Sequence, residues 1–209
     1  MRLFPSNVPK SKRAFDLVVS ILGLIITFPV FLIILIWARV FNGKPVIFNQ
    51  IRPGYHGEPF TLHKIRTMKV AYNSNGRPLP DDQRLTSFGR WLRATSLDEL
   101  PELINVIRGE MSLVGPRPLL MQYLQRYSPE QARRHEVLPG ITGWAQINGR
   151  NALEWEDKFS LDVWYVDNWS FLLDMKILFL TVWKVMTREG INQPGFSTAE
   201  EFMGKNRTE

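Results

Sequence analysis

The sequence predicts an α+β fold that is mostly helical and carries a membrane-embedded helix near the N-terminus. Residues 17–38 contain no charged side chain, which is typical of a segment buried in lipid. Residues 45–50 and 60–68 have the composition and the alternation of paired strands, so a small β-hairpin is expected. Beyond residue 96 the apolar residues recur at helical spacing, which predicts that a helix follows the hairpin.

The composition restricts the class of protein. A chain of 209 residues forms one domain, or one domain with an appendage, and 44% hydrophobic residues is ordinary for a folded protein. The absence of cysteine excludes disulfides and thiolate metal sites. The three histidines show no metal-ligand spacing, so we expect them on the surface or in loops and expect no zinc site. The net charge of +6 suits nucleic acid, an anionic membrane or phosphorylated ligands.

The uncharged stretch at residues 17–38 has the length of a membrane anchor. Its roughly 22 residues form about 33 Å of helix, enough to cross the hydrocarbon core of a bilayer. It is too long for the core of a signal peptide, and no small-residue cleavage site follows it. We therefore expect a membrane partner and no nucleic acid.

Basic side chains on both flanks favour a re-entrant anchor, which enters and leaves the same membrane face, over a spanning helix. Pro29 lies near the middle, where it can bend the helix, and the Thr27 hydroxyl is able to satisfy a freed backbone group. We expect residues 1–13 to lie on anionic headgroups, with Asp16 paired at the interface to a neighbouring basic residue. The basic residues are Lys10, Lys12 and Arg13 before the stretch, and Arg39, Lys44 and Arg52 after it.

Local patterns predict the remaining elements. Residues 86–94 form an amphipathic helix suited to a membrane surface, and residues 155–186 should lie in the interface because charges interrupt their apolar runs. Asp81 and Asp82 are expected to be solvated loop residues. The other expected elements are a turn at 52–54, a surface loop over 73–84, a helix over 119–136, and a strand and turn over 139–151. The expected divisions are the anchor (1–40), the main domain (41–194) and a tail (195–209).

Two adjacent carboxylates, Asp98 and Glu99, precede the helical pattern. Proline has no N–H, so Pro101 is tolerated only in the first turn of a helix, where the backbone amides have no partner within the helix. Leu97 or Asp98 is therefore expected to cap the helix. The helix dipole would then favour the ionised form of the Asp98 carboxylate. One interpretation is structural: Asp98 is a cap, and Glu99 belongs to a capping box with Ser96. The other interpretation is that the pair carries chemistry, and this stretch alone does not decide between them.

Two later segments offer groups for binding an anion. Pro116 and Pro118 fix the backbone on both sides of Arg117 and would hold its guanidinium in a preset direction, although the arginine could also be incidental. Glycines within residues 139–151 would let the backbone approach a ligand closely, and Arg150 would recognise phosphate. The segment matches neither the P-loop nor the dinucleotide-binding fingerprint.

Over nearly its whole length the sequence resembles the bacterial sugar transferases, which are monotopic phosphoglycosyl transferases. Its size is similar to that of members that consist of the catalytic domain alone. One departure is Phe28, where some members have a small polar residue before the membrane proline. The matching motifs occur in the same order: Lys12-Arg13 with Asp16, Pro29, KIRTM at 64–68, LPDDQR at 79–84, SLDELP at 96–101, LVGPRP at 113–118, PGITG at 139–143 and NGRN at 148–151.

The resemblance implies an enzyme on the cytoplasmic face of the bacterial inner membrane, with interfacial helices around an active site that faces the cytosol. Such enzymes move a sugar-1-phosphate from a UDP-sugar, often N-acetylated, to polyprenyl (undecaprenyl) phosphate and release UMP. This is the first membrane step of glycoconjugate assembly. The implied partners are the UDP-sugar, polyprenyl phosphate, membrane phospholipid and downstream glycosyltransferases.

The resemblance also implies roles for individual residues. Asp98 would be the nucleophile that forms an aspartyl phosphosugar, and would bind Mg2+. Glu99 would be the second member of a catalytic dyad, handling a proton or supporting the metal site. The chemistry is consistent, because a carboxylate is a recognised nucleophile in phosphoryl transfer and cations offset the charge of a diphosphate. The residues expected to bind substrate are Arg93, Arg117, Arg150, Pro116 and Pro118.

Alternative functions stay open at this point. A membrane-surface adaptor that binds anionic lipid would need neither Asp98 nor Glu99. An enzyme could also make the same transfer in a ternary complex, with Asp98 acting only as a base or metal ligand. A nucleic-acid binder is suggested by charge alone, and the membrane anchor argues against it.

Overall fold

The computed structural model describes residues 8–149, 153–187 and 201–204, and they confirm the predicted α+β class with mostly helical content. The sheets are small: β1 pairs with β2, and β3 with β4. The elements, with η for a 3-10 helix, are α1 (Lys10–Phe41), β1 (Ile47–Pro53), η1 (Tyr55–Gly57), β2 (Pro59–Ile65), α2 (Asp81–Arg84), α3 (Ser87–Ala94), η2 (Leu97–Glu99), α4 (Glu102–Arg108), β3 (Ser112–Val114), η3 (Met121–Gln125), α5 (Pro129–Ala132), η4 (Arg133–His135), β4 (Gly140–Thr142), α6 (Trp144–Asn148), α7 (Trp155–Asp167) and α8 (Phe171–Thr187).

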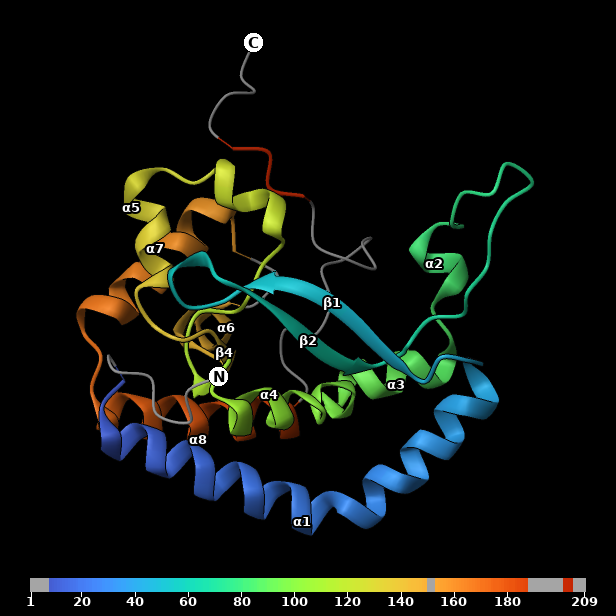
Figure 1. The fold of residues 1–209 in the computed structure, drawn as a ribbon, viewed down its shortest axis with the longest axis horizontal. Helices are drawn as coiled ribbons and strands as arrows, with labels where there is room; N and C mark the ends of the chain where they lie inside the picture. The colour runs from blue at the N-terminus through green and yellow to red at the C-terminus, as the bar shows by residue number, and fades with distance from the viewer. Residues whose placement is uncertain (1–7, 150–152, 188–200, 205–209) are drawn as a thin grey trace.

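The long N-terminal helix α1 is bent into a shallow V (Figure 1). Both ends of the V rise toward the rest of the protein, and the bend is the part farthest from it. By length and composition α1 could cross a membrane, and only 11% of its most apolar stretch is buried. That exposure is unlike the core helix of a soluble domain and is consistent with association with a membrane.

Pro29 and Thr27 together favour the bend. Pro29 lies inside α1 and has no N–H to donate to the carbonyl of Ile25. The Thr27 hydroxyl donates to a different carbonyl, that of Gly23, at 2.6 Å. A hydroxyl bonded to the carbonyl four residues earlier often bends a helix, so Thr27 adds to the bend and does not repair the bond lost at the proline.

The hairpin of β1 and β2 is confirmed as an antiparallel pair, but it extends further than expected. Arg52 lies inside the ladder opposite Phe60, where the sequence suggested a turn at 52–54. The ladder ends where Pro53 faces Pro59, because neither proline has an N–H to extend it. Arg52 is therefore held on a strand, with a fixed direction.

The parallel pair of β3 and β4 explains the glycine-rich segment. A Cβ on Gly140 would lie 2.1 Å from the backbone nitrogen of Gly115, so these glycines let two backbones pack against each other. Their role is thus structural, whereas the sequence suggested an approach to a ligand. The expected strand over 139–151 is confirmed only at β4, because Trp144–Asn148 form helix α6.

The prediction of one helix over 119–136 is wrong, because a new helix starts in its middle. Ser128 and Gln131 form a capping box, and Pro129 occupies a first-turn position where its missing N–H costs nothing. The chain there forms η3, α5 and η4. The loop expected over 73–84 is interrupted by the short α2, whereas α3 confirms the amphipathic helix.

His135 corrects the expectation that all three histidines are surface or loop residues. It lies in η4, is 8% exposed, and its Nδ1–H donates to the carbonyl of Gly54 at 3.1 Å. Burial lowers the pKa of His135 to about 4, so the imidazole is neutral at physiological pH.

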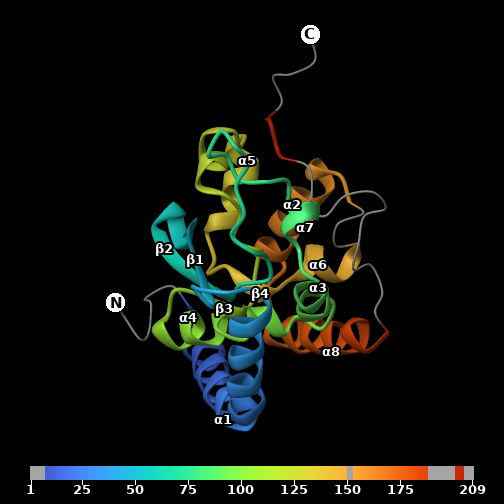
Figure 2. The same ribbon diagram turned by 90° about the vertical axis from the view of Figure 1, so that its right-hand side faces the viewer.

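A layer of helices lies next to α1, which also contacts β3 through Asp16 and the hairpin through Ile34 and Ala38. Figure 2 shows α3, α4 and α8 at a similar level above α1. The main core lies over this layer and includes Phe60, Val106, Met111, Tyr165 and Ile177. Large apolar side chains remain exposed on the helices of this part, among them Ile25, Ile26, Phe28, Ile33, Ile36 and Val40 of α1, Trp91 of α3, and Leu172, Phe179, Val182, Trp183 and Met186 of α8.

Buried basic side chains tie the start of α1 to the core. The Lys12 Nζ atom lies 2.5 Å from Asp174 Oδ2 of α8, and both side chains are almost inaccessible. Arg13 donates to the carbonyls of Val106 (2.6 Å) and Ile107 (2.9 Å) near the C-terminal end of α4, where a cation also suits the helix dipole. The expectation that these two residues lie on lipid headgroups is therefore wrong.

Asp16 is likewise a core residue and not an interfacial one. It is 1% exposed, and its carboxylate accepts hydrogen bonds from the Ser112 hydroxyl at 2.7 Å and from the Leu113 amide at 3.3 Å. Polar groups of α1 thus satisfy partners in β3, because a buried carboxylate needs donors around it.

Replacing Lys12 with methionine should destabilise the protein strongly. The substitution leaves Asp174 buried without its cation, and removing one partner of a buried ion pair typically costs about 3–5 kcal/mol. Thermal unfolding in detergent or nanodiscs would show this as a lower Tm.

The matched control is Lys10→Met, which removes an exposed lysine from the same helix and should change stability by less than about 0.5 kcal/mol. The double variant Lys12→Met/Asp174→Asn should regain part of the lost Tm. Equal effects of the Lys10 and Lys12 substitutions would contradict the role given to the buried pair.

Candidate active site

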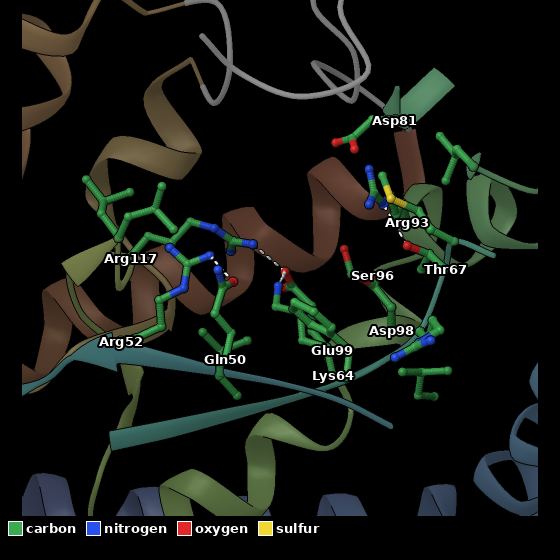
Figure 3. A pocket seen from close by; sticks show the side chains of 18 of the residues that line it. Gln50, Arg52, Lys64, Thr67, Asp81, Arg93, Ser96, Asp98, Glu99 and Arg117 are labelled. Atoms are coloured by element: carbon green, nitrogen blue, oxygen red, sulfur yellow. Dashed lines mark hydrogen bonds and ion pairs between the residues drawn. The ribbon is translucent and has the colours of Figure 1, made fainter. Parts of the chain in front are cut away.

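A cavity of about 1810 Å³ is lined by residues of the hairpin, α3, η2 and the segment after β3. Four of the predicted site residues line it: Asp98, Glu99, Arg93 and Arg117. Figure 3 shows Arg52 and Arg117 on one side of Glu99, with Arg93 on the other side. The fold therefore brings the predicted carboxylate pair and two of the three predicted arginines to one place.

Asp98 lies in the 3-10 turn η2, before α4 begins. Pro101 is itself the N-cap of α4, so the prediction that Leu97 or Asp98 caps this helix is wrong. Ser96, just before the turn, has a φ of 55°, a left-handed conformation that is uncommon for a residue with a side chain. Such backbone is costly and persists where the surrounding structure enforces it, often at functional sites.

The Asp98 carboxylate is buried but not used by the fold. Its residue is 8% exposed, and within the described part of the chain it has no hydrogen-bond or ion-pair partner. Burial raises the pKa of Asp98 and the adjacent Glu99 carboxylate raises it further, whereas three nearby cations lower it. The net direction is opposite to the expected dipole effect, because burial and the Glu99 charge outweigh the nearby cations.

The Glu99 carboxylate, in contrast, is fully engaged. Its Oε1 accepts hydrogen bonds from Lys64 Nζ at 2.7 Å and from Arg117 Nη2 at 2.5 Å. Burial alone would raise the pKa of Glu99, but Arg117 and Lys64 hold it well below its usual value. The capping-box interpretation is wrong, since Ser96 makes no side-chain capping bond.

A third carboxylate, Glu102, completes the charged cluster. It is 2% exposed, and its Oε1 lies 3.1 Å from Lys64 Nζ. Burial, opposed by Lys64 and reinforced by Glu99, raises the pKa of Glu102 to about 7. Lys64 therefore serves two carboxylates at once, and Glu102 exchanges a proton near neutral pH.

Arg117 lies between two prolines, and its guanidinium pairs with Glu99. Pro116 and Pro118 are buried beside it, and the backbone carbonyl of Arg117 accepts a hydrogen bond from Arg134 Nη2 at 2.8 Å. Arg134 is fixed in turn by a buried ion pair with Asp162 at 2.7 Å. The cavity lining includes Arg117 and neither proline, so a direct substrate contact for the prolines stays a prediction.

The other predicted residues are placed less completely. Arg93 lines the cavity, and its Nε donates to Thr67 Oγ1 at 3.0 Å. Arg150 lies outside the residues that the structure describes. Asp81 also lines the cavity and pairs with Arg84 at 2.5 Å, so it is not simply solvated.

Arg52 was expected to flank the membrane anchor, and Lys64 belongs to the KIRTM motif, but neither was assigned to the site from the sequence. Three further charged residues of this region were also not assigned to it: Glu102, Arg134 and Asp162. Their patterns carried little signal, because a single charge on a short strand or helix is usually a solvated residue. The alternation of apolar and polar residues in the two hairpin strands could have shown which of their side chains share a face. It could not have shown that this face packs against η2.

The donor set fits a hard divalent cation that is shared with a substrate. Mg2+ usually binds one or two protein carboxylates and takes its other ligands from water and phosphate oxygens. Asp98 offers one unengaged carboxylate at the cavity. Among the described residues, no group of three or more His, Asp or Glu side chains could form an all-protein site. A Mg2+ ion would therefore need the phosphates of a ligand.

Comparisons with known proteins agree on one family. Residues 8–188 match the family described as bacterial sugar transferase. The uncharacterized sugar transferase EpsL of Bacillus subtilis is 60% identical over 193 residues, which cover 92% of this chain and 96% of that protein.

Two relatives have names that state a reaction. A UDP-glucose:undecaprenyl-phosphate glucose-1-phosphate transferase of Escherichia coli is 43% identical over 83% of this chain and 39% of its own length. An undecaprenyl-phosphate galactose phosphotransferase of Salmonella typhimurium is 40% identical over 86% of this chain and 41% of its own length. The chain thus spans less than half of each of these two proteins.

The raised pKa of Glu102 predicts that the contribution of this residue to stability falls as the pH rises from about 4.5 to about 7. In this window the Glu102 carboxyl binds more protons in the folded protein than in the unfolded chain, because its pKa is about 7 when folded against an ordinary value of 4.5. The lowered pKa of His135 acts in the opposite direction between about pH 4 and pH 6.5. The stabilising contribution of Glu102 is complete below the ordinary pKa of 4.5 and is lost as the pH rises through the folded-state pKa of about 7. Asp98, whose pKa is also raised, acts in the same direction. Comparing the change in Tm between about pH 5 and about pH 8 in the wild type and in a Glu102 variant separates the contribution of Glu102 from that of His135.

Glu102→Gln keeps the shape of the side chain and removes its titration, so the Tm of this variant at about pH 8 relative to about pH 5 should be higher than that of the wild type. Glu58→Gln, at an exposed position, is the matched control and should keep the wild-type dependence. A Glu102→Gln protein whose Tm changes with pH as much as the wild type would refute the assignment.

Proposed function

Since the chain belongs to the bacterial sugar transferase family and is a sugar-phosphate transferase, we propose that it moves a sugar-1-phosphate from a UDP-sugar to polyprenyl phosphate and releases UMP. The observation that carries this proposal is the buried Asp98 carboxylate, which faces a cavity lined with arginines and has no structural partner in the described chain. Undecaprenyl phosphate is the proposed acceptor, because the names of two relatives contain it. The transfer would start the assembly of a membrane glycoconjugate and supply downstream glycosyltransferases.

Asp98 is the proposed nucleophile. Its carboxylate oxygen attacks the phosphorus that carries the sugar, and the bond to the bridging oxygen breaks, so that UMP leaves with the electron pair. The enzyme then holds an aspartyl phosphosugar. A phosphate oxygen of the polyprenyl phosphate attacks the same phosphorus, the bond to Asp98 breaks, and the carboxylate is regenerated.

The surrounding cations prepare the site for an anionic substrate. An ionised Asp98 and a diphosphate repel each other, and Arg93 and Arg117 offset that repulsion from two sides of the cavity. Glu99 is proposed to hold Lys64 and Arg117 in place. Since both cations keep Glu99 ionised, it is a poor proton donor. Mg2+, held by Asp98 and the phosphates, would supply further positive charge to the phosphoryl oxygens.

The exposed apolar surfaces support a monotopic position at the cytoplasmic face of the plasma membrane. Both ends of the bent α1 lie on one side (Figure 1), as a re-entrant anchor requires, and α3 and α8 lie above it at one level (Figure 2). With α1 in the hydrocarbon region, the apolar side chains of α3 and α8 would meet phospholipid headgroups. The cavity would then lie where a lipid phosphate and a soluble nucleotide can both arrive.

The decisive experiment is the intact-protein mass after incubation with Mg2+ and a panel of UDP-sugars, N-acetylated ones included, without lipid acceptor. The proposal predicts a mass gain of one sugar phosphate, release of UMP, and loss of both in Asp98→Asn. Turnover with lipid should fall by roughly 10³-fold or more, since a covalent step cannot be replaced. Asp157→Asn, at an exposed position, is the matched control.

The outcomes separate the alternatives. UMP release that begins only when polyprenyl phosphate is added, with no adduct, would indicate a ternary complex. Binding to anionic vesicles with no UMP release from any donor, and no change in Asp98→Asn, would indicate an adaptor.

Removal of divalent cations should abolish UMP release. EDTA takes away the ion that Asp98 is proposed to share with the diphosphate, and the remaining arginines carry too little charge to bring two anions together. Added Mg2+ should restore the rate in a coupled UMP assay. Full activity in EDTA would rule out the metal.

A further inference from the structure

Arg52 is a cavity residue that the mechanism above does not use. It projects from β1 into the cavity that also holds Asp98 and Arg117. Its Nη2 donates to a neutral group, Gln50 Oε1, at 2.6 Å, and its buried Nε has no partner in the described chain. Within residues 8–149, 153–187 and 201–204, no carboxylate lies at ion-pair distance from Arg52, and Glu102 acts on its charge only from longer range.

A second guanidinium lies beside it. Figure 3 shows Arg52 and Arg117 together on the same side of Glu99. Burial, followed by repulsion from Arg117, lowers the pKa of Arg52 to about 10, which is the expected effect of a like charge close by. Among the described residues, Arg117 forms an ion pair only with Glu99, and Lys64 already shares that carboxylate. The pair therefore carries an excess of positive charge on one side of the cavity.

Two adjacent guanidiniums, of which only Arg117 has a carboxylate partner among the described residues, match a phosphate group. Each guanidinium can donate two parallel hydrogen bonds to phosphate oxygens, and a doubly charged phosphate monoester would offset both cations. Gln50 already orients Arg52, and Arg134 orients the backbone of Arg117, so the two groups are positioned before a ligand arrives.

We propose that Arg52 and Arg117 form one phosphate-monoester site, occupied first by the leaving UMP and then by the incoming polyprenyl phosphate. This inference rests on the proposed function. When Asp98 attacks phosphorus, the leaving oxygen lies opposite it, in line. When the lipid phosphate attacks the aspartyl phosphosugar, it must enter opposite Asp98 as well. Both phosphates therefore require the same position, and Arg52 with Arg117 supplies cations on one side of the dyad.

The test is equilibrium binding to the full chain in nanodiscs, in an Asp98→Asn background that prevents turnover. The probes are UMP, uridine and farnesyl phosphate, a short isoprenyl phosphate monoester. Arg52→Gln should weaken UMP and farnesyl phosphate about 10- to 100-fold each, the usual worth of charge-assisted hydrogen bonds. Uridine affinity should not change, and UMP and farnesyl phosphate should compete. Arg108→Gln, an exposed arginine outside the cavity lining, is the matched control and should change none of these.

Two further measurements keep the proposal open to refutation. Arg52→Lys keeps the positive charge but lacks the paired N–H donors of a guanidinium. Its affinity for both phosphates should therefore lie between the affinities of the wild type and Arg52→Gln. Replacing Arg52 should not lower the Tm, because it removes repulsion from Arg117, so lost binding cannot be ascribed to unfolding. Unchanged affinities for both phosphates would overturn the proposal, and weakening of only one would overturn the shared site.

Failure of this inference can be told apart from failure of the proposed function. If the wild type forms the sugar-phosphate adduct but Arg52→Gln binds both monoesters normally, only the assignment of Arg52 is wrong. If the wild type forms no adduct with any donor, the nucleophile is wrong, whatever Arg52 binds.

Discussion

The carboxylate of Glu99, shared by Lys64 and Arg117, is the contact on which the arrangement of the site depends. It joins strand β2, the turn η2 and the segment after β3 through hydrogen bonds of 2.7 Å and 2.5 Å. Because Lys64 and Arg117 pair with Glu99, neither of them pairs with the neighbouring Asp98, whose carboxylate stays available at the cavity. Two adjacent acids thus have opposite tasks: one stabilises the site, and the other is left for chemistry.

Local patterns predicted much of the fold, and competing local signals explain the errors. The hairpin and α3 follow from alternation and amphipathic spacing. The helix expected over 119–136 failed because the Ser128 capping box starts a new turn there, and start signals compete with periodicity. Asp98 and Arg117 were assigned to the site through motifs, whereas Lys64 and Arg134 were not. Their partners lie far away in sequence, and only packing reveals them.

The buried charges show why composition alone could not assign the membrane contacts. Lys12 and Arg13 carry the sign expected for headgroup binding, yet Asp174 and the carbonyls of α4 take them up inside the protein. A basic residue next to an apolar helix can serve lipid or protein, and its charge is the same in both cases. The glycines of β3 and β4 are similar, because a residue that permits close approach does not tell which partner approaches.

The contacts of Lys12 and Arg13 join the apolar helix α1 to the part of the fold that carries the proposed catalytic residues. They fasten the first turn of α1 to α8 and to the end of α4, which begins three residues after Glu99. With α1 in the bilayer as proposed, these contacts set the height of the proposed nucleophile above the bilayer midplane. Membrane thickness and hydrophobic mismatch, which tilt or lift an embedded helix, would shift that height and so the access of the lipid substrate. Chain length and saturation of the surrounding lipids become variables of the reaction rate.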